Sequence, residues 1–252
     1  MSTPEDAVGG EPARPAKVFA TTHWSVVLNA AQVESAVAEK ALQHLCRVYW
    51  YPIYAFVRRR GHAAHDAQDL AQEFFARLLE KNWIARADRS RGRFRSFLLM
   101  VLKRFMADEW DKARTLKRGG RGPGLPLPLA TEESRCTREP ADPCTPEQAF
   151  EKQWALTLLE TVLGQLRADA EREGKARQFE LLKPCLLGSR ESQPYAELAV
   201  ALETSEGAVK VAVHRLRERY RNRLRAEIAG TVAAPEEVDA ELRHLFRVLA
   251  RS

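Results

Sequence analysis

The sequence has few cysteines and no long apolar run, and these shortages exclude several classes of protein. Its four cysteines, Cys46, Cys136, Cys144 and Cys185, include no CxxC pair, so we expect neither disulfides nor structural zinc. The apolar runs are far shorter than the roughly 18 residues that a membrane-spanning helix needs. Residues 1–18 are polar and contain Pro and Gly without an apolar signal-peptide core, which predicts a disordered leader on a cytoplasmic protein.

Signatures of catalysis are also missing. The chain contains no GxxxxGK[ST], HExxH or GxSxG motif, and no GxGxxG after a strand pattern. The glycines at 119–124 lie in a stretch dense in Gly and Pro that has neither helical nor strand periodicity. We therefore expect no enzymatic activity, no catalytic residues, no metal and no cofactor.

Charge is distributed unevenly along the chain. Residues 17–121 contain 20 Lys or Arg and 10 Asp or Glu, a net charge of +10, and residues 205–225 contain 7 and 2, a net charge of +5. Since the whole chain carries +6, the remaining residues carry a net charge of −9. Two separate basic surfaces favour a polyanionic partner, with nucleic acid as the first candidate. Two ordinary solvated faces are the alternative.

Apolar residues recur at helical spacing on both sides of a Gly/Pro-rich segment, and alternating β-branched runs are scarce. This pattern predicts an all-α protein with two small helical domains joined by a flexible linker. The expected ranges are a leader at 1–18, a first domain at 19–118, a linker at 119–145, a second domain at 146–228 and a C-terminal helical extension at 229–252.

The expected helices each carry a line of core residues. In the first domain, Thr22 is a candidate cap for a short helix, and Pro52 must kink or restart the helix that contains it. The C-terminal extension fits either a regulatory or a packing element. The predicted core stripes are Leu42, Leu45, Tyr49, Pro52, Ile53 and Phe56; Leu70, Phe74 and Leu78, with Phe75 and Leu79 beside them; Phe94, Phe97, Leu98, Val101, Leu102 and Phe105; Phe150, Trp154, Leu158, Leu159, Val162 and Leu166; and, in the extension, Val238, Leu242, Leu245, Phe246 and Leu249.

The segment 195–224 has the spacing of a helix-turn-helix. Ser205 is the expected N-cap of its second helix, which has an apolar line beside a cationic line about 100° around the helix. Such a helix can enter the major groove of DNA, unless it is only a solvated surface helix. The candidate site includes Ser205 and Glu206 at the helix start, Lys210, Val211, His214 and Arg215 nearest the bases, and Arg217, Arg221 and Arg225 nearer the phosphates.

Two further groups of residues in the first domain fit either a binding role or an ordinary structural role. Asp69, Gln72 and Glu73 form an anionic and amide patch that suits a basic protein partner, or simply a solvated helix face. A metal site that adds the nearby His62, His65 and Asp66 is a remote alternative. The aromatic residues Phe94, Phe97 and Trp110 fit stacking on unpaired bases, although core packing is the favoured interpretation for the two phenylalanines.

Three segments resemble an RNA polymerase sigma factor of the extracytoplasmic-function type. DAQDLAQEFFARLLE at 66–80 is similar to the polymerase-binding helix of that family, and FRSFLLMVLKRFMADEWDKAR at 94–114 is similar to its promoter-melting helix. YAELAVALETSEGAVKVAVHRLRERYR at 195–221 resembles its C-terminal helix-turn-helix. The three segments occur in the family's order and lie in both expected domains.

The resemblance implies a role for each group in transcription initiation. Asp69, Gln72 and Glu73 would dock on a coiled coil of the largest subunit of core RNA polymerase. The minus 10 element would be captured as single-stranded DNA by Arg95, Lys103, Arg104, Trp110 and Arg114, and the helix from Ser205 would contact the minus 35 element. An anti-sigma protein is a further possible partner.

One departure from the family pattern lies in the turn. Glu203 occupies a position where the family usually has glycine, and a positive φ there would cost on the order of 1 kcal/mol. The competing hypotheses are a stand-alone helix-turn-helix regulator, which would bind duplex DNA without polymerase, and a helical scaffold, which leaves the basic faces unexplained.

Overall fold

The computed structural model describes residues 36–80, 83, 93–116, 144–186, 194–232 and 234–250. The regular structure of these residues is helical without strands, which confirms the all-α prediction. The leader, the helix expected after Thr22, and linker residues 119–143 lie outside the described residues. The helices are α2 (Ala36–Arg59), α3 (Ala64–Glu80), α4 (Phe94–Leu116), α6 (Pro146–Arg172), α7 (Ala176–Leu182), η2 (Lys183–Leu186), α8 (Tyr195–Ala201), α9 (Glu206–Ala229), η3 (Pro235–Glu237) and α10 (Val238–Ala250).

The helix ends follow from local chemistry. Helix α6 begins with a capping box, in which Thr145 Oγ1 accepts from the Gln148 N–H at 3.2 Å and the Thr145 N–H donates to Gln148 Oε1 at 2.8 Å. Gly61, with φ of +91°, follows the end of α2, a conformation that glycine adopts without steric cost. Pro52 is buried inside α2, and the helix does not restart there.

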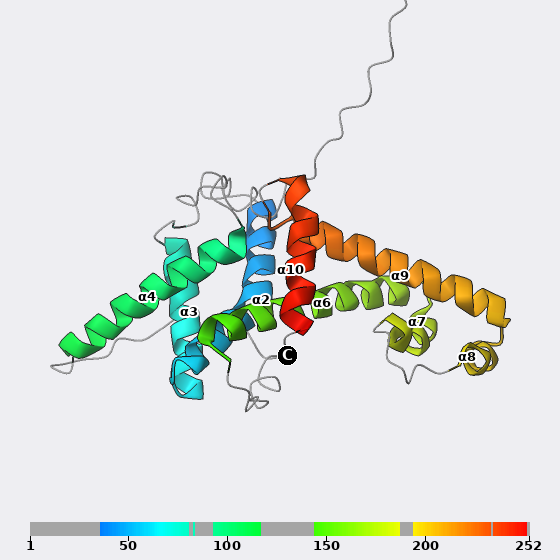
Figure 1. Ribbon diagram of the computed structural model, residues 1–252, viewed down its shortest axis with the longest axis horizontal. Helices are drawn as coiled ribbons and strands as arrows, with labels where there is room; N and C mark the ends of the chain where they lie inside the picture. The colour runs from blue at the N-terminus through cyan, green and yellow to red at the C-terminus, as the bar shows by residue number, and fades with distance from the viewer. Residues whose placement is uncertain are drawn as a thin grey trace, which may run out of the picture.

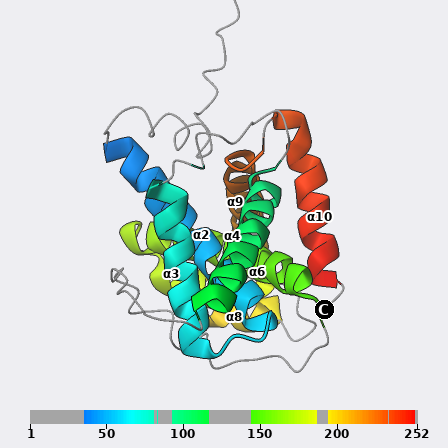
Figure 2. The same cartoon turned by 90° about the vertical axis from the view of Figure 1, so that its left-hand side faces the viewer.

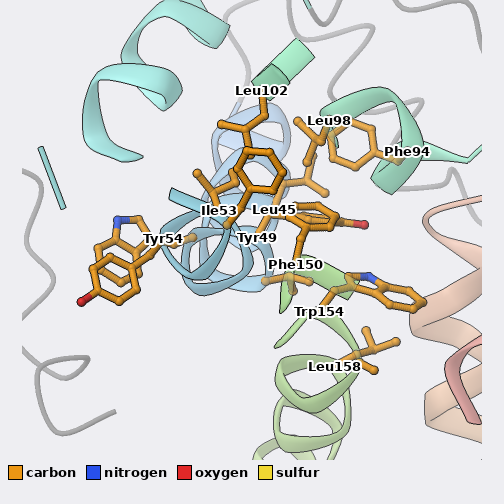
Figure 3. Packing of buried hydrophobic residues seen from close by; sticks show 14 of the residues in the cluster. Leu45, Tyr49, Ile53, Tyr54, Phe94, Leu98, Leu102, Phe150, Trp154 and Leu158 are labelled. Atoms are coloured by element: carbon orange, nitrogen blue, oxygen red, sulfur yellow. The ribbon is translucent and has the colours of Figure 1, made fainter. Parts of the chain in front are cut away.

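The predicted halves are not separated in this structure, because one hydrophobic core extends through both. Tyr49 of α2 lies at its centre, 5.3 Å from the ring of Phe94 and stacked at 6.4 Å on Phe150 (Figure 3). Trp154 of α6 belongs to the same cluster, and both α6 and α2 supply fully buried rings. We define this set of residues as the large cluster, and helices on both sides of the predicted linker depend on it.

A second, smaller cluster supports the start of α9. It consists of Leu182, Cys185, Leu198, Ala199, Val209 and Val213, which come from α7, η2, α8 and α9. We call it the small cluster. Figure 1 shows α7 and α8 at the right-hand end of the molecule, beside the N-terminal part of α9 and far from α3 and α4.

The C-terminal extension forms helix α10, as the sequence predicted. It packs on α6 and α9 and crosses the middle of the molecule in Figure 1, and Figure 2 shows it along one side. Val238 and Leu245 are buried and Leu242 and Leu249 are half-buried. The prediction was wrong for Phe246, which is 56% exposed, because it lies about 100° around the helix from Leu245.

Candidate nucleic-acid interface

The turn between α8 and α9 contains a capped helix start and one non-glycine residue with a positive φ. Ser205 caps α9, and its Oγ accepts from the Ala208 N–H at 3.2 Å. Glu203 has φ of +52°, so a non-glycine residue occupies the left-handed region. The Thr204 N–H donates to the Ala199 carbonyl at 2.9 Å, which closes the turn.

The first turns of α9 present the candidate base-contacting residues to solvent. Val211 is an exposed apolar residue, and His214 and Arg215 are exposed beside it. Lys210 lies 2.9 Å from Glu206, one helical turn earlier. An exposed i,i+4 pair contributes only about 0.3–0.5 kcal/mol, so Lys210 can exchange this partner for an anionic ligand at little cost.

The cations farther along α9 differ in their partners. Arg217 donates to the Cys185 carbonyl at 2.8 and 3.2 Å and thereby ties α9 to η2. Arg225 pairs with Asp239, and its hydrogen bond and charge lower the pKa of that carboxyl. Arg221 is exposed. Of the three expected phosphate contacts, Arg217 and Arg225 therefore already have intramolecular partners.

The other side of α9 carries cations that the sequence analysis did not single out. Arg219 lies 3.2 Å from Glu173, and Arg223 pairs with Asp169 of α6. Both pairs connect α9 to the C-terminal end of α6. Their only sequence signal is the acidic composition of the C-terminal part of α6, which does not identify the partners.

On α4, three of the candidate residues are exposed and the aromatic residues divide as expected. Lys103 lies 2.8 Å from Glu147 of α6, Arg104 is exposed and Trp110 is 62% exposed. Phe94 is buried and Phe97 is half-buried against the large cluster, so both pack in the core. The side chain of Arg114 lies outside the described residues.

Arg95 was expected on the exposed cationic face of α4, and the structure corrects this placement. Its side chain is 5% exposed, pairs with Glu151 and Glu241, and lies 5.2 Å from the ring centre of Trp154. Burial lowers the pKa of Arg95, but the hydrogen bond and charge of Glu241 outweigh burial and raise it. In this arrangement the guanidinium is not accessible to DNA.

The anionic patch on α3 is only partly free. Asp69 is 64% exposed, with His65 Nδ1 3.1 Å from its Oδ2. Gln72 is half-buried. Glu73 accepts from Arg77 Nε at 2.6 Å, and Arg77 Nη1 also donates to Glu109 of α4 at 2.6 Å. Asp69 is therefore the most accessible carboxylate of the predicted docking patch.

The described residues contain no group of three or more His, Cys, Asp and Glu side chains placed to hold a metal ion. Nor does any helix within those residues have the length and apolarity needed to cross a membrane. Cys46, Cys144 and Cys185 are free thiols. Burial raises the pKa of Cys46 to about 11, so this thiol is in its protonated form at neutral pH.

Residues 49–115 match the family model described as Sigma-70 region 2. The match begins within α2, includes α3 and ends near the end of α4. This segment of the chain is therefore similar to region 2 of the sigma-70 family of RNA polymerase sigma factors. No curated protein and no solved structure matches the chain.

Proposed function

We propose that the chain is a sigma factor of the extracytoplasmic-function type that recruits core RNA polymerase to promoters and opens the DNA there. The observation that carries this proposal is the match to Sigma-70 region 2 over α2–α4. The order of the elements is consistent with it, because an all-helical second half with a capped, cationic helix follows the matched segment. The protein itself performs no chemistry in this proposal.

Each interface has a proposed role. Helix α3 docks on a coiled coil of the largest subunit of core polymerase through Asp69, with Gln72 and Glu73 beside it. Helix α4 contacts the minus 10 element as a single strand through Lys103 and Arg104, with Trp110 available for stacking on a base. Exposure of these side chains supports the proposal for all but Gln72 and Glu73, which are half-buried.

The α8–α9 pair is the proposed helix-turn-helix for the minus 35 element. Exposure of Val211, His214 and Arg215 at the capped end of α9 supports base contacts in the major groove. The adjoining Arg221 supports a phosphate contact. A residue in the left-handed conformation in the turn is consistent with this motif.

Co-elution with purified bacterial core RNA polymerase on a sizing column tests the proposal. Wild type should co-elute, and Asp69→Arg should reduce the complex strongly, since it reverses the most accessible charge of the docking patch. The matched control is Glu171→Arg, which reverses an exposed charge on α6 in the other half of the chain. Equal loss in both variants, or no complex with wild type, would contradict the docking assignment.

A stand-alone DNA-binding regulator is the second candidate. The observation that favours it is that the family match ends at residue 115, so the capped basic helix α9 lies outside it. Under this alternative the free protein binds duplex DNA tightly and does not co-elute with polymerase. The co-elution experiment combined with a duplex-binding assay separates the two candidates.

A further inference from the structure

Carboxylates from the C-terminal half of the chain hold the beginning of α4. Glu241 of α10 is 1% exposed, lies 2.8 Å from Arg93 Nε, and accepts from Arg95 Nε and, at 3.3 Å, from Nη2. Glu151 of α6 pairs with Arg95 and also with His244 of α10. The two positive charges of Arg93 and Arg95 balance the two negative charges of Glu151 and Glu241. Both arginines belong to the N-terminal half of the chain and both glutamates to the C-terminal half.

Two neighbouring contacts between the halves also join a basic group of the N-terminal half to a carboxylate of the C-terminal half. Lys103 of α4 pairs with Glu147 of α6 at 2.8 Å, and His44 of α2 hydrogen-bonds to Glu227 of α9 at 3.0 Å. In each case the basic group belongs to residues 36–116 and the carboxylate to residues 144–250. The C-terminal half therefore offers the basic half the kind of charge that a DNA backbone would offer.

The main chain and an aromatic ring complete this contact. The Phe94 N–H, at the start of α4 where no intrahelical acceptor exists, donates to the Thr231 carbonyl at 3.1 Å. The guanidinium of Arg95 lies over the ring of Trp154. Helix α6, the chain after α9 and helix α10 together cover the first turn of α4.

We propose that α10 is an autoinhibitory clasp. When the clasp is closed, Glu241 pairs with the guanidinium groups of Arg93 and Arg95. When it is open, DNA phosphates pair with these guanidinium groups instead. This inference rests on the proposed function of α4 as a single-strand-binding helix. Because Arg95 is buried between α6 and α10, its contact with DNA requires α10 to move away and its ion pair with Glu151 of α6 to open. The desolvation cost of buried charges offsets much of their mutual attraction, so a polyanion can compete for them.

Single-strand binding by the full chain tests the clasp. We compare wild type with Glu241→Gln, which keeps the side-chain shape and removes the charge. Glu236→Gln is the matched control, since it removes an exposed carboxylate on η3. The probe is a short fluorescein-labelled DNA strand of mixed sequence, and the readout is fluorescence anisotropy over a series of salt concentrations.

The expected gain follows from counterion release. In single strands each phosphate contact contributes about 0.7 to the slope of log K against log salt, so each released arginine strengthens binding about fivefold at 0.1 M salt. Glu241→Gln should therefore bind about fivefold tighter if Arg93 alone is released, and about 25-fold tighter if both arginines are released. The slope should become steeper by about 0.7 to 1.4, and Glu236→Gln should match wild type.

A combined variant separates the clasp from simple loosening of the fold. Adding Arg93→Gln and Arg95→Gln to Glu241→Gln should abolish the gain, and circular dichroism confirms that each variant remains helical. A gain that survives loss of both guanidiniums would overturn the proposal. Unchanged affinity and slope in Glu241→Gln would overturn it too.

Polymerase co-elution of the same proteins distinguishes this proposal from the function on which it rests. If wild type co-elutes but Glu241→Gln leaves strand affinity unchanged, the clasp is wrong and the sigma-factor function stands. If wild type does not co-elute, the sigma-factor function is wrong. An arginine-dependent gain in strand affinity would in that case still support the clasp.

Discussion

Helices α4 and α9 carry the candidate DNA-contacting cations, and they use these cations differently. At the start of α9 the charged side chains are exposed, and the pair between Lys210 and Glu206 lies within one helical turn. At the start of α4, Arg95 is buried and its partners Glu151 and Glu241 lie 56 and 146 residues away. Similar sequence patterns therefore produce an accessible surface in one helix and a covered one in the other.

The difference follows from what each helix packs against. The start of α9 is supported by the small cluster, which leaves most of the helix circumference in water. The start of α4 packs into the large cluster between α2, α6 and α10, where an arginine is retained only with carboxylates beside it. A cationic line on a helix thus indicates a binding face only where no other element covers it.

The largest expected effect comes from a mutation in the large cluster, and with its companion variant it tests whether the two clusters unfold separately. Trp154→Ala should lower the free energy of unfolding by about 3–5 kcal/mol, because the side chain is fully buried in the large cluster. Urea unfolding measures the loss. Hydrogen exchange should become faster in both 36–116 and 146–172, since both segments depend on this cluster.

Leu198→Ala in the small cluster is the companion variant. It should accelerate exchange in 176–216 and leave 43–80 unchanged, because the small cluster contains no residue of α2 or α3. Accelerated exchange throughout the chain in Leu198→Ala would show that the two clusters unfold as one unit.

The contribution of each α9 arginine to DNA binding should depend on whether that arginine already pairs with a carboxylate of the protein. We expect Arg221→Ala to weaken duplex binding about eightfold at 0.1 M salt and to reduce the slope of log K against log salt by about 0.9. Arg223→Ala is the matched control, since Arg223 already pairs with Asp169 and donates to Gln165. A flat salt response of wild type, or equal effects of both variants, would contradict the assignment of this face.

The strained turn before α9 should respond to glycine. Glu203→Gly should raise the free energy of unfolding by about 1 kcal/mol, because glycine removes the cost of a side chain at positive φ. Gly174→Ala is the reverse experiment, since Gly174 has φ of +69°, and it should destabilise the protein by a similar amount. Thermal unfolding measures both, and a destabilised Glu203→Gly would reject the strain argument.

The smallest expected effect concerns the exposed ion pair between α4 and α6. The hydrogen bond from Lys103 is the main cause that lowers the pKa of Glu147. The pair therefore stabilises the fold above the ordinary glutamate pKa of about 4.3, and this contribution is lost as the pH falls through the lower folded-state pKa.

Comparison of wild type with Lys103→Met between pH 7 and about pH 3 measures this contribution. An exposed pair is worth no more than about 1 kcal/mol, so the stability difference should be small at neutral pH and should shrink on acidification. A difference that stays constant with pH would assign it to the packing of the lysine side chain instead of its charge.

Much of the fold was predictable because it depends on local periodicity. The lines through Tyr49, Phe150 and Leu245 identified buried faces, and Ser205 identified the start of α9. The resemblance to the sigma-factor family, which usually has glycine in this turn, also pointed to a strained residue at Glu203.

Contacts between distant segments were not predictable in this way. Stacking of Tyr49 on Phe150 joins two segments that the sequence pattern assigned to separate domains. The partners of Arg95 are equally invisible to periodicity, because nothing in the sequence around Glu241 identifies a residue on α4. The exposure of the candidate side chains was therefore predicted correctly where they stay in water, as for Val211, His214 and Arg215 on α9, and incorrectly for Arg95, which a distant helix covers.

The distance in sequence between Arg95 and Glu241 also has a consequence for synthesis. The two residues are 146 positions apart, so at about 5–20 residues per second Arg95 is translated about 7–30 s before its partner. During this interval the nascent chain contains α2, α3 and α4 without the helix that neutralises the start of α4. The newly made N-terminal half is therefore more cationic at this position than the finished protein.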